Sequence, residues 1–198
     1  MNRVFAAAWE IHQFCERRSW PFCFIGGMAV QRWGEQRATD DVDLTLATGW
    51  GAEERFADEL LPSFPIRPGF TRERLLTQRV LFVTASNGIG IDVALGAIPF
   101  ELRTVERSSL WEINSEQRLR TCSAEDLLVH KCFANRDRDW IDAEGVLIRQ
   151  WRTIDLKQVH VELQPLADLK ESPEILIRLN DLVKKLSQSP VLSELRRQ

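Results

Sequence analysis

Three aspartates are spaced so that a sheet could bring their carboxylates together. Asp41 and Asp43 alternate with apolar residues in the run Asp41–Leu46, and residues two apart on a strand point to the same face. Asp92 interrupts a second apolar run, Ile91–Val93. Carboxylates on one face repel one another unless a cation lies between them. Mg²⁺ suits them, and three such acids predict a two-metal site for phosphoryl or nucleotidyl transfer.

A glycine pair precedes the first two acids. Gly26-Gly27 lies between an expected strand, Phe22–Ile25, and an expected helix that begins near Met28. Small residues at such a junction let a phosphate approach backbone N–H groups at the positive end of a helix. No Gly-Lys-Ser/Thr follows the pair and it is not part of a Gly-x-Gly-x-x-Gly motif, so P-loop and dinucleotide-binding folds are disfavoured. Each feature alone is usually structural, and only their order makes the pattern specific.

The elements that must position these residues are read from periodicity. An acid site requires the 41–46 strand to lie beside a strand over 89–95, with all three carboxylates on one face. Asn87-Gly88 predicts a two-residue hairpin turn, which makes residues 78–84 an antiparallel partner and the sheet mixed. Other strands are expected over 109–113 and 118–122, and helices over 4–18, 52–61, 124–135 and 137–150 and from Leu156 and Pro173.

The predicted fold class is therefore α/β (α+β), a mixed β-sheet core flanked by helices. We expect residues 1–122 to form this core and residues 123–198 to form a C-terminal helical region packed on it. Prolines at positions 62, 65 and 68 predict a loop within the core. No repeat or low-complexity segment interrupts this plan.

Composition narrows the class of protein. The chain has 198 residues, of which 44% are hydrophobic and 28% charged, as in soluble globular proteins. It contains no apolar run long enough to span a membrane and no signal-peptide pattern. Four scattered cysteines without a Cys-x-x-Cys pair argue against zinc and disulfides, so we expect buried thiols in a cytoplasmic protein. The net charge of −3 argues against duplex DNA as a partner, but leaves room for a local basic patch.

The motif around the acids resembles a known signature. The segment from Gly26-Gly27 to Thr39-Asp40-Asp41-Val42-Asp43-Leu44 is similar to that of the polymerase-beta-like nucleotidyltransferase superfamily, which has a third acid on a later strand. The order of the whole chain resembles the AbiEii/AbiGii-type nucleotidyltransferases, many of them toxins of bacterial toxin–antitoxin pairs. The runs Ser123–Lys131 and Asn135–Asp142 are similar to that family's downstream motif. The resemblance covers roughly residues 20 to 150.

This resemblance implies an enzyme that moves a nucleoside monophosphate from an NTP to an acceptor hydroxyl with Mg²⁺ or Mn²⁺. Asp41 and Asp43 would hold the metals, and Asp92 would share one metal and activate the hydroxyl. Gly26 and Gly27 would clamp the nucleotide phosphates.

The downstream motif implies further nucleotide-binding residues. Lys131 would pair with the triphosphate, although an ordinary solvated helix lysine is an equal alternative. Asp139 and Asp142 share one helix face and could orient Lys131 or the base, or form structural salt bridges. Arg37 could contact a phosphate, although loop arginines are usually only solvated.

The acceptor stays open at this level. The toxin branch implies RNA or tRNA as acceptor and an antitoxin protein as partner. Gly26-Gly27-Met28-Ala29 and Asp40–Thr45 also look like aminoglycoside nucleotidyltransferases, whose small polycationic acceptors would suit the negative net charge. A non-catalytic nucleotide- or partner-binding module that kept the fold is a third alternative, but clustered acids without a metal would be a standing cost.

Overall fold

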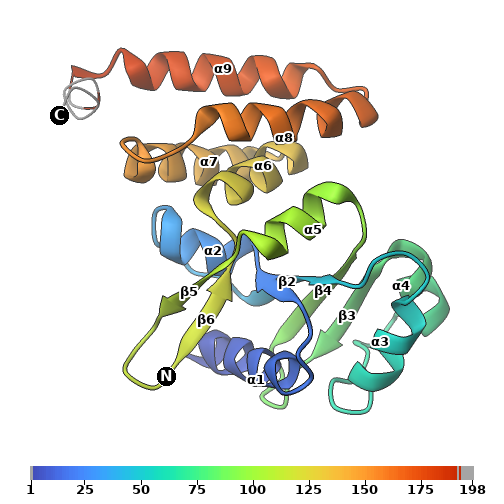
Figure 1. The fold of residues 1–198 in the computed structure, drawn as a ribbon. Helices are drawn as coiled ribbons and strands as arrows, with labels where there is room; N and C mark the ends of the chain where they lie inside the picture. The colour runs from blue at the N-terminus through green and yellow to red at the C-terminus, as the bar shows by residue number, and fades with distance from the viewer. Residues whose placement is uncertain (1, 191, 193–198) are drawn as a thin grey trace. The chain divides into compact units, whose positions relative to one another are not determined.

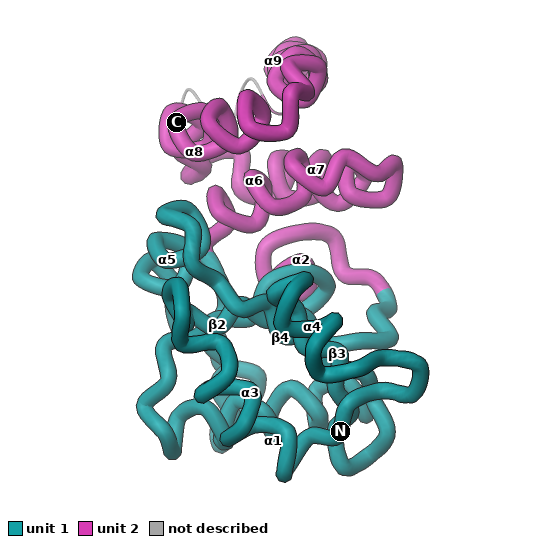
Figure 2. The backbone as a smooth tube through the Cα atoms, turned by 90° about the vertical axis from the view of Figure 1, so that its right-hand side faces the viewer, with its two compact units in different colours: residues 1–28, 38–122 teal, residues 29–37, 123–198 magenta. Residues whose placement is uncertain are grey.

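The computed structural model describes residues 2–190 and 192. The chain forms two compact units (Figure 2). The first comprises residues 1–28 and 38–122, and the second comprises residues 29–37 and 123–198. The unit boundary therefore differs from a single division at residue 122, because residues 29–37 cluster with the C-terminal helices. No helix in the described part of the chain is long and apolar enough to cross a membrane.

The first unit is built on a six-stranded sheet with the order β3-β4-β2-β1-β6-β5 (Figure 1). The strands are β1 (Phe22–Phe24), β2 (Asp41–Ala47), β3 (Val80–Thr84), β4 (Gly90–Gly96), β5 (Ser109–Glu112) and β6 (Arg118–Thr121). The β2–β4 and β1–β6 pairs are parallel and the other three pairs are antiparallel. The predicted mixed sheet is confirmed, as is the position of the 41–46 strand beside the 89–95 strand.

Helix α1 (Arg3–Arg17) shares a core with alternate residues of the central strands. Its Ile11 is buried in the same cluster as Val42 and Leu44 of β2. Because side chains alternate along a strand, Asp41 and Asp43 project from the opposite face of β2. Helix α5 (Pro99–Glu106) packs on β2 as well. One face of the central strands thus packs against α1 in the apolar core, and the opposite face can carry the acids.

Four helices of the second unit lie between residues 124 and 187: α6 (Ala124–Ala134), α7 (Asp137–Gln150), α8 (Leu156–Leu169) and α9 (Glu174–Ser187). Ser123 caps α6 by accepting a hydrogen bond from the Asp126 N–H at 3.0 Å, as its sequence predicts. Pro173 precedes the first residue of α9 and so lies at the N-cap, one position earlier than expected.

The end of helix α2 (Gly26–Trp33) and the segment after it belong to the second unit because α7 binds their backbone. Arg149 donates to the carbonyl of Gly34 at 2.6 Å, and Gln150 donates to the carbonyl of Trp33 at 3.0 Å. Gly145 accommodates the close approach of Glu35, whose backbone nitrogen would lie 3.2 Å from a Cβ at residue 145. Sequence periodicity alone carries no sign of these long-range contacts.

Two short helices and one turn differ from the sequence-based prediction. Helix α4 (Arg72–Gln78) occupies the end of the expected loop, so β3 begins at Val80 rather than at residue 78. Arg79 ends α4 in a left-handed conformation, with φ of +55°. Helix α5 was not predicted, although Pro99 at its first turn is a helix-start signal.

The hairpin between β3 and β4 has a longer connection than expected. Ala85 donates to the carbonyl of Ile89, and Gly88 donates to the carbonyl of Ala85, both at 2.9 Å. Only Gly88 has a positive φ, +83°. A two-residue turn of the expected type would need positive φ at Asn87 as well, so the connection is a three-residue loop.

Candidate active site

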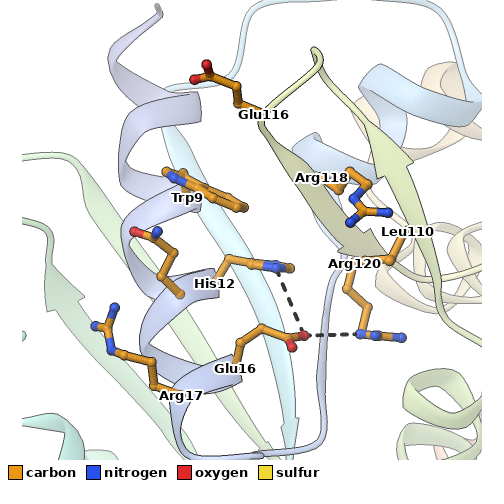
Figure 3. Close-up of a pocket in the computed structure, with 9 residues that line it drawn as sticks. Trp9, His12, Glu16, Arg17, Leu110, Glu116, Arg118 and Arg120 are labelled. Carbon is orange, nitrogen blue, oxygen red and sulfur yellow. Dashed lines mark ion pairs between the residues drawn. The ribbon is translucent and has the colours of Figure 1, made fainter.

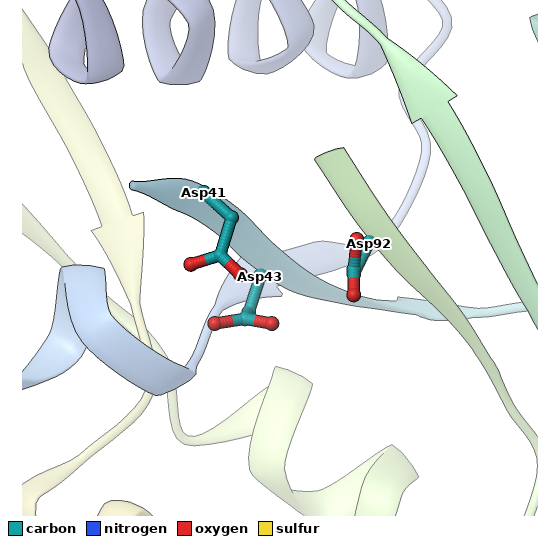
Figure 4. A group of neighbouring side chains, drawn as sticks. All are labelled: Asp41, Asp43 and Asp92. Atoms are coloured by element: carbon teal, nitrogen blue, oxygen red, sulfur yellow. The ribbon is translucent and has the colours of Figure 1, made fainter. Parts of the chain in front are cut away.

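The acid cluster, defined as Asp41, Asp43 and Asp92, lies on one face of the sheet (Figure 4). Asp43 is directly opposite Asp92 in the register of the parallel pair β2–β4, and Asp41 is opposite Gly90. Each residue offers a carboxylate oxygen, and these three oxygens lie within 4.8 Å of one another. The expectation that all three acids share one face is confirmed. Hard oxygen ligands at this spacing fit Mg²⁺ or Mn²⁺.

The glycine pair lies beside the acid cluster. Gly26 begins helix α2 with a φ of +52°, and a Cβ at this residue would overlap the carboxylate of Asp43. A Cβ at Gly27 would overlap the hydroxyl of Thr39, which in turn is 3.2 Å from a carboxylate oxygen of Asp41. Both glycines are therefore required by close approach, and the backbone of Gly26 is half-buried next to the carboxylate of Asp43.

Arg67 is the residue of this site that sequence reasoning missed. Its guanidinium forms an ion pair with Asp92 and lies over the ring of Phe82, 4.8 Å from the ring centroid. Gly90 makes room for it, since a Cβ there would lie 3.1 Å from the guanidinium. Arg67 lies between Pro65 and Pro68 of the expected loop, where nothing in the local pattern marks it as a partner of a strand residue.

The third acid has an altered affinity for protons. Burial raises the pKa of the Asp92 carboxyl above its usual range, the charge of Arg67 opposes this shift, and the charge of Asp41 reinforces it. Asp92 is therefore a more basic carboxylate than an exposed aspartate. Without a cation in the cluster, Arg67 supplies the neutralising charge at Asp92.

The second unit holds a separate charged cluster around Lys131. Its side chain is buried, with the residue 6% exposed, and its ammonium lies 3.0 Å from Asp139 and 2.8 Å from Asp142. Arg37 makes a two-pronged contact with Asp142 at 2.6 and 2.7 Å. Arg136 bonds Asp139 at 2.5 Å. The structure thus brings Lys131, Asp139 and Asp142 of the downstream motif together with the loop residue Arg37, which the sequence analysis named separately.

This cluster keeps its acids ionised. Burial alone would raise the pKa of Asp139, but hydrogen bonds from Arg136 and Lys131 outweigh it and lower the pKa. Burial likewise opposes ionisation of Asp142, and hydrogen bonds from Arg37 and Lys131 outweigh it. Lys131, Arg37 and Arg136 thus hold two buried carboxylates in their charged form.

The fold of the chain is similar to that of nucleotidyltransferase-like proteins of known structure. An antigenic nucleotidyltransferase-like protein from Paracoccidioides brasiliensis superposes with a TM-score of 0.50 at 12% identity, covering 91% of each chain. ANT(2″)-Ia in complex with adenylyl-2″-tobramycin superposes with a TM-score of 0.51 at 13% identity, covering 86% of this chain and 99% of that one. The likeness at these identities concerns the fold. Neither a family model nor a curated protein sequence matches the chain significantly.

Proposed function

We propose that the protein is a nucleotidyltransferase that moves a nucleoside monophosphate from an NTP to an acceptor hydroxyl. The single observation that carries this proposal is the acid cluster on adjacent parallel strands next to the Gly26-Gly27 turn. Three carboxylates this close cost stability unless a cation offsets them. A nucleotidyltransferase-like fold supports the same class of reaction.

Asp41 and Asp43 would hold the Mg²⁺ ions, and Asp92 would share one of them. When bound, the metals supply charge neutralisation at the phosphates and lower the pKa of the attacking hydroxyl. The acceptor oxygen forms a bond to the α-phosphorus while the bond from this phosphorus to the bridging oxygen breaks and pyrophosphate leaves. Asp92 would take the hydroxyl proton, as a carboxylate beside the attacking oxygen can.

The remaining contacts to the nucleotide would come from the glycine pair and from the cations of the Lys131 cluster. Gly26 and Gly27 would let phosphate oxygens reach the backbone N–H groups that begin α2. Lys131 and Arg37 would bind the triphosphate, with Asp139 and Asp142 holding them in place or orienting the base. The cations gathered in the Lys131 cluster suit this role.

For the acceptor we propose RNA, including tRNA, because the downstream motif resembles the toxin-type nucleotidyltransferases. Such an enzyme would act in the cytoplasm and would be paired with an antitoxin protein. An aminoglycoside-type small molecule is the second candidate. It is supported by the fold shared with ANT(2″)-Ia, whose structure holds an adenylylated tobramycin.

The decisive experiment offers both acceptors to one preparation. Wild type and Asp43→Asn are incubated with Mg²⁺ and each of the four NTPs labelled at the α-phosphate, with total RNA in one arm and tobramycin in the other. We expect labelled RNA with wild type and none with Asp43→Asn, which removes charge at nearly constant volume. If only tobramycin were labelled, the acceptor would be an aminoglycoside-type small molecule rather than RNA.

A result with no labelled product in either arm would contradict the enzymatic proposal for these acceptors. Thermal unfolding then tests whether the protein is instead a non-catalytic module that binds nucleotides. A non-catalytic nucleotide-binding module would still be stabilised by Mg²⁺ with an NTP, through ligand linkage. Absence of any shift with all four nucleotides would leave a protein-interaction role for the fold.

A further inference from the structure

A second pocket lies in the first unit, between α1 and the β5–β6 hairpin (Figure 3). It has a volume of about 500 Å³ and contains none of the three acids and neither glycine of the candidate active site. Trp9, His12 and Arg17 come from α1, and Arg118 and Arg120 come from β6. We call this the arginine pocket. Its volume falls within the range of small-ligand sites, roughly 300–1,000 Å³.

The strand side of the arginine pocket is set by the register of the hairpin. Arg118 and Arg120 are two residues apart on β6 and share a face, and Leu110 is directly opposite Arg120. Arg120 approaches Glu16 of α1, with 3.7 Å between the charged atoms. The basic groups therefore come together from segments that are far apart in the sequence, and a linear charge count cannot reveal them.

Two of the three arginines that line the pocket are not neutralised by a carboxylate within the described residues. Within residues 2–190, the guanidinium groups of Arg17 and Arg118 make no ion pair or hydrogen bond. Two glutamates, Glu16 and Glu116, also line the pocket, so the arginines exceed the acids by one. Guanidinium groups without a carboxylate partner favour phosphate, which they bind in a two-pronged geometry.

The helix side of the arginine pocket supplies aromatic surface and an unused polar atom. His12 stacks on Trp9 with ring centroids 5.2 Å apart and planes inclined by 17°. His12 is only 5% exposed, and its Nδ1 has no hydrogen-bond partner among the described residues. Trp9 is partly exposed where it lines the pocket. A partly exposed indole offers a stacking surface for a nucleobase, a contact that tolerates any base.

We propose that the arginine pocket binds a nucleotide unit, with its phosphate at Arg118 and its base against Trp9. The unit is either a free nucleoside monophosphate or one residue of a single-stranded RNA. This site is separate from the acid cluster and does not depend on the proposed transfer reaction. Its binding needs no divalent cation, because the positive charge is supplied by arginines.

The test measures binding in EDTA by fluorescence anisotropy of a short labelled single-stranded RNA. Arg118→Gln should weaken binding by roughly three- to tenfold, since it removes one charge-assisted contact. Glu116→Gln should strengthen binding, because it removes a negative charge from the same pocket. Arg74→Gln, an exposed arginine of α4 outside the pocket, is the matched control and should leave the affinity unchanged.

Competition with unlabelled AMP distinguishes the two sources of the nucleotide unit. Displacement of the RNA by AMP would assign the pocket to a single nucleotide, and binding of RNA without such displacement would assign it to a strand. Far-UV circular dichroism checks that each variant is folded. Equal affinity of wild type, Arg118→Gln and Glu116→Gln would overturn the proposal, as would failure of both probes to bind wild type. Either result leaves the transfer assay, and hence the proposed function, untouched.

Discussion

The Asp43 carboxylate occupies the space that a side chain at Gly26 would take. The glycine is therefore needed for more than the approach of a phosphate. It begins α2 with a φ of +52°, a backbone conformation that residues other than glycine rarely adopt. The backbone of the turn and one proposed metal ligand fit together only while residue 26 lacks a Cβ.

Replacement of Gly26 by alanine should damage both stability and metal binding. The left-handed conformation costs about 1–2 kcal/mol with a side chain, and the overlap with Asp43 must displace the carboxylate. Gly49→Ala is the matched control, because Gly49 has a φ of +70° but nothing within 4 Å of an added Cβ. We expect urea unfolding to show a clearly larger loss for Gly26→Ala, together with a smaller stabilisation by Mn²⁺. Equal behaviour of the two variants would contradict this.

Arg67→Met should make the protein more dependent on divalent cations. Without the guanidinium, Asp92 loses its counter-ion, and we expect a loss of about 1–2 kcal/mol in EDTA. A metal bound to the acids would restore more of this stability than it adds to wild type, since no internal cation competes with it. Thermal unfolding with and without Mg²⁺ measures the difference.

The control for Arg67→Met is Arg72→Met, which breaks the exposed ion pair with Asp58 at 2.7 Å. This variant should respond to Mg²⁺ as wild type does. A Mg²⁺ response of Arg67→Met no larger than that of wild type would exclude Arg67 as a competitor for the acids.

The Lys131 cluster should make the protein sensitive to acid. Asp139 and Asp142 have lowered pKa values in the folded state. Their stabilisation is fully present above the ordinary aspartate pKa of about 4 and is lost as the pH falls through the lowered values. The difference in unfolding free energy between wild type and Asp139→Asn should therefore shrink below about pH 4.

The four cysteines should be unreactive in the native protein. All are buried, and none forms a disulfide within the described residues. Burial raises the pKa of the Cys15 thiol to about 12, although the charge of Arg18 opposes this shift. Burial also raises the pKa of the Cys132 thiol. Because the thiolate is the reactive species, a colorimetric thiol reagent at pH 8 should modify none of them within minutes and all four in urea. Rapid modification of Cys15 or Cys132 in native buffer would show that its element opens readily.

The acid cluster could be predicted because it depends on local regularities. Alternation along β2 and an acid inside an apolar strand are visible in the sequence, and one register of two parallel strands completes the site. Arg67 could not be found in this way, since its contact with Asp92 depends on the path of an irregular loop. Helix α4 was missed because its short run of charged residues has little periodicity, while Thr71 as its cap is a weak signal.

The Lys131 cluster could be predicted from the sequence only in part. The spacing of Asp139 and Asp142 on one helix face was visible, and so was the lysine, but its burial was not. A sequence cannot tell a buried ion-pair cluster from a solvated helix face when both carry the same charges. The approach of Arg37 from before β2 to Asp142 on α7 is equally invisible, because it joins residues that lie far apart in the chain.

The register of β2 and β4 also has a consequence for how the protein folds. Asp43 faces Asp92 only in one alignment of these strands, and a slip by a single residue would turn one of them to the opposite face. This parallel pairing joins segments far apart in the sequence, which is slow to form because a long loop must close first. Competence to bind a divalent cation should therefore arise late in refolding. The bound ion would then report that the central strands have found their correct alignment.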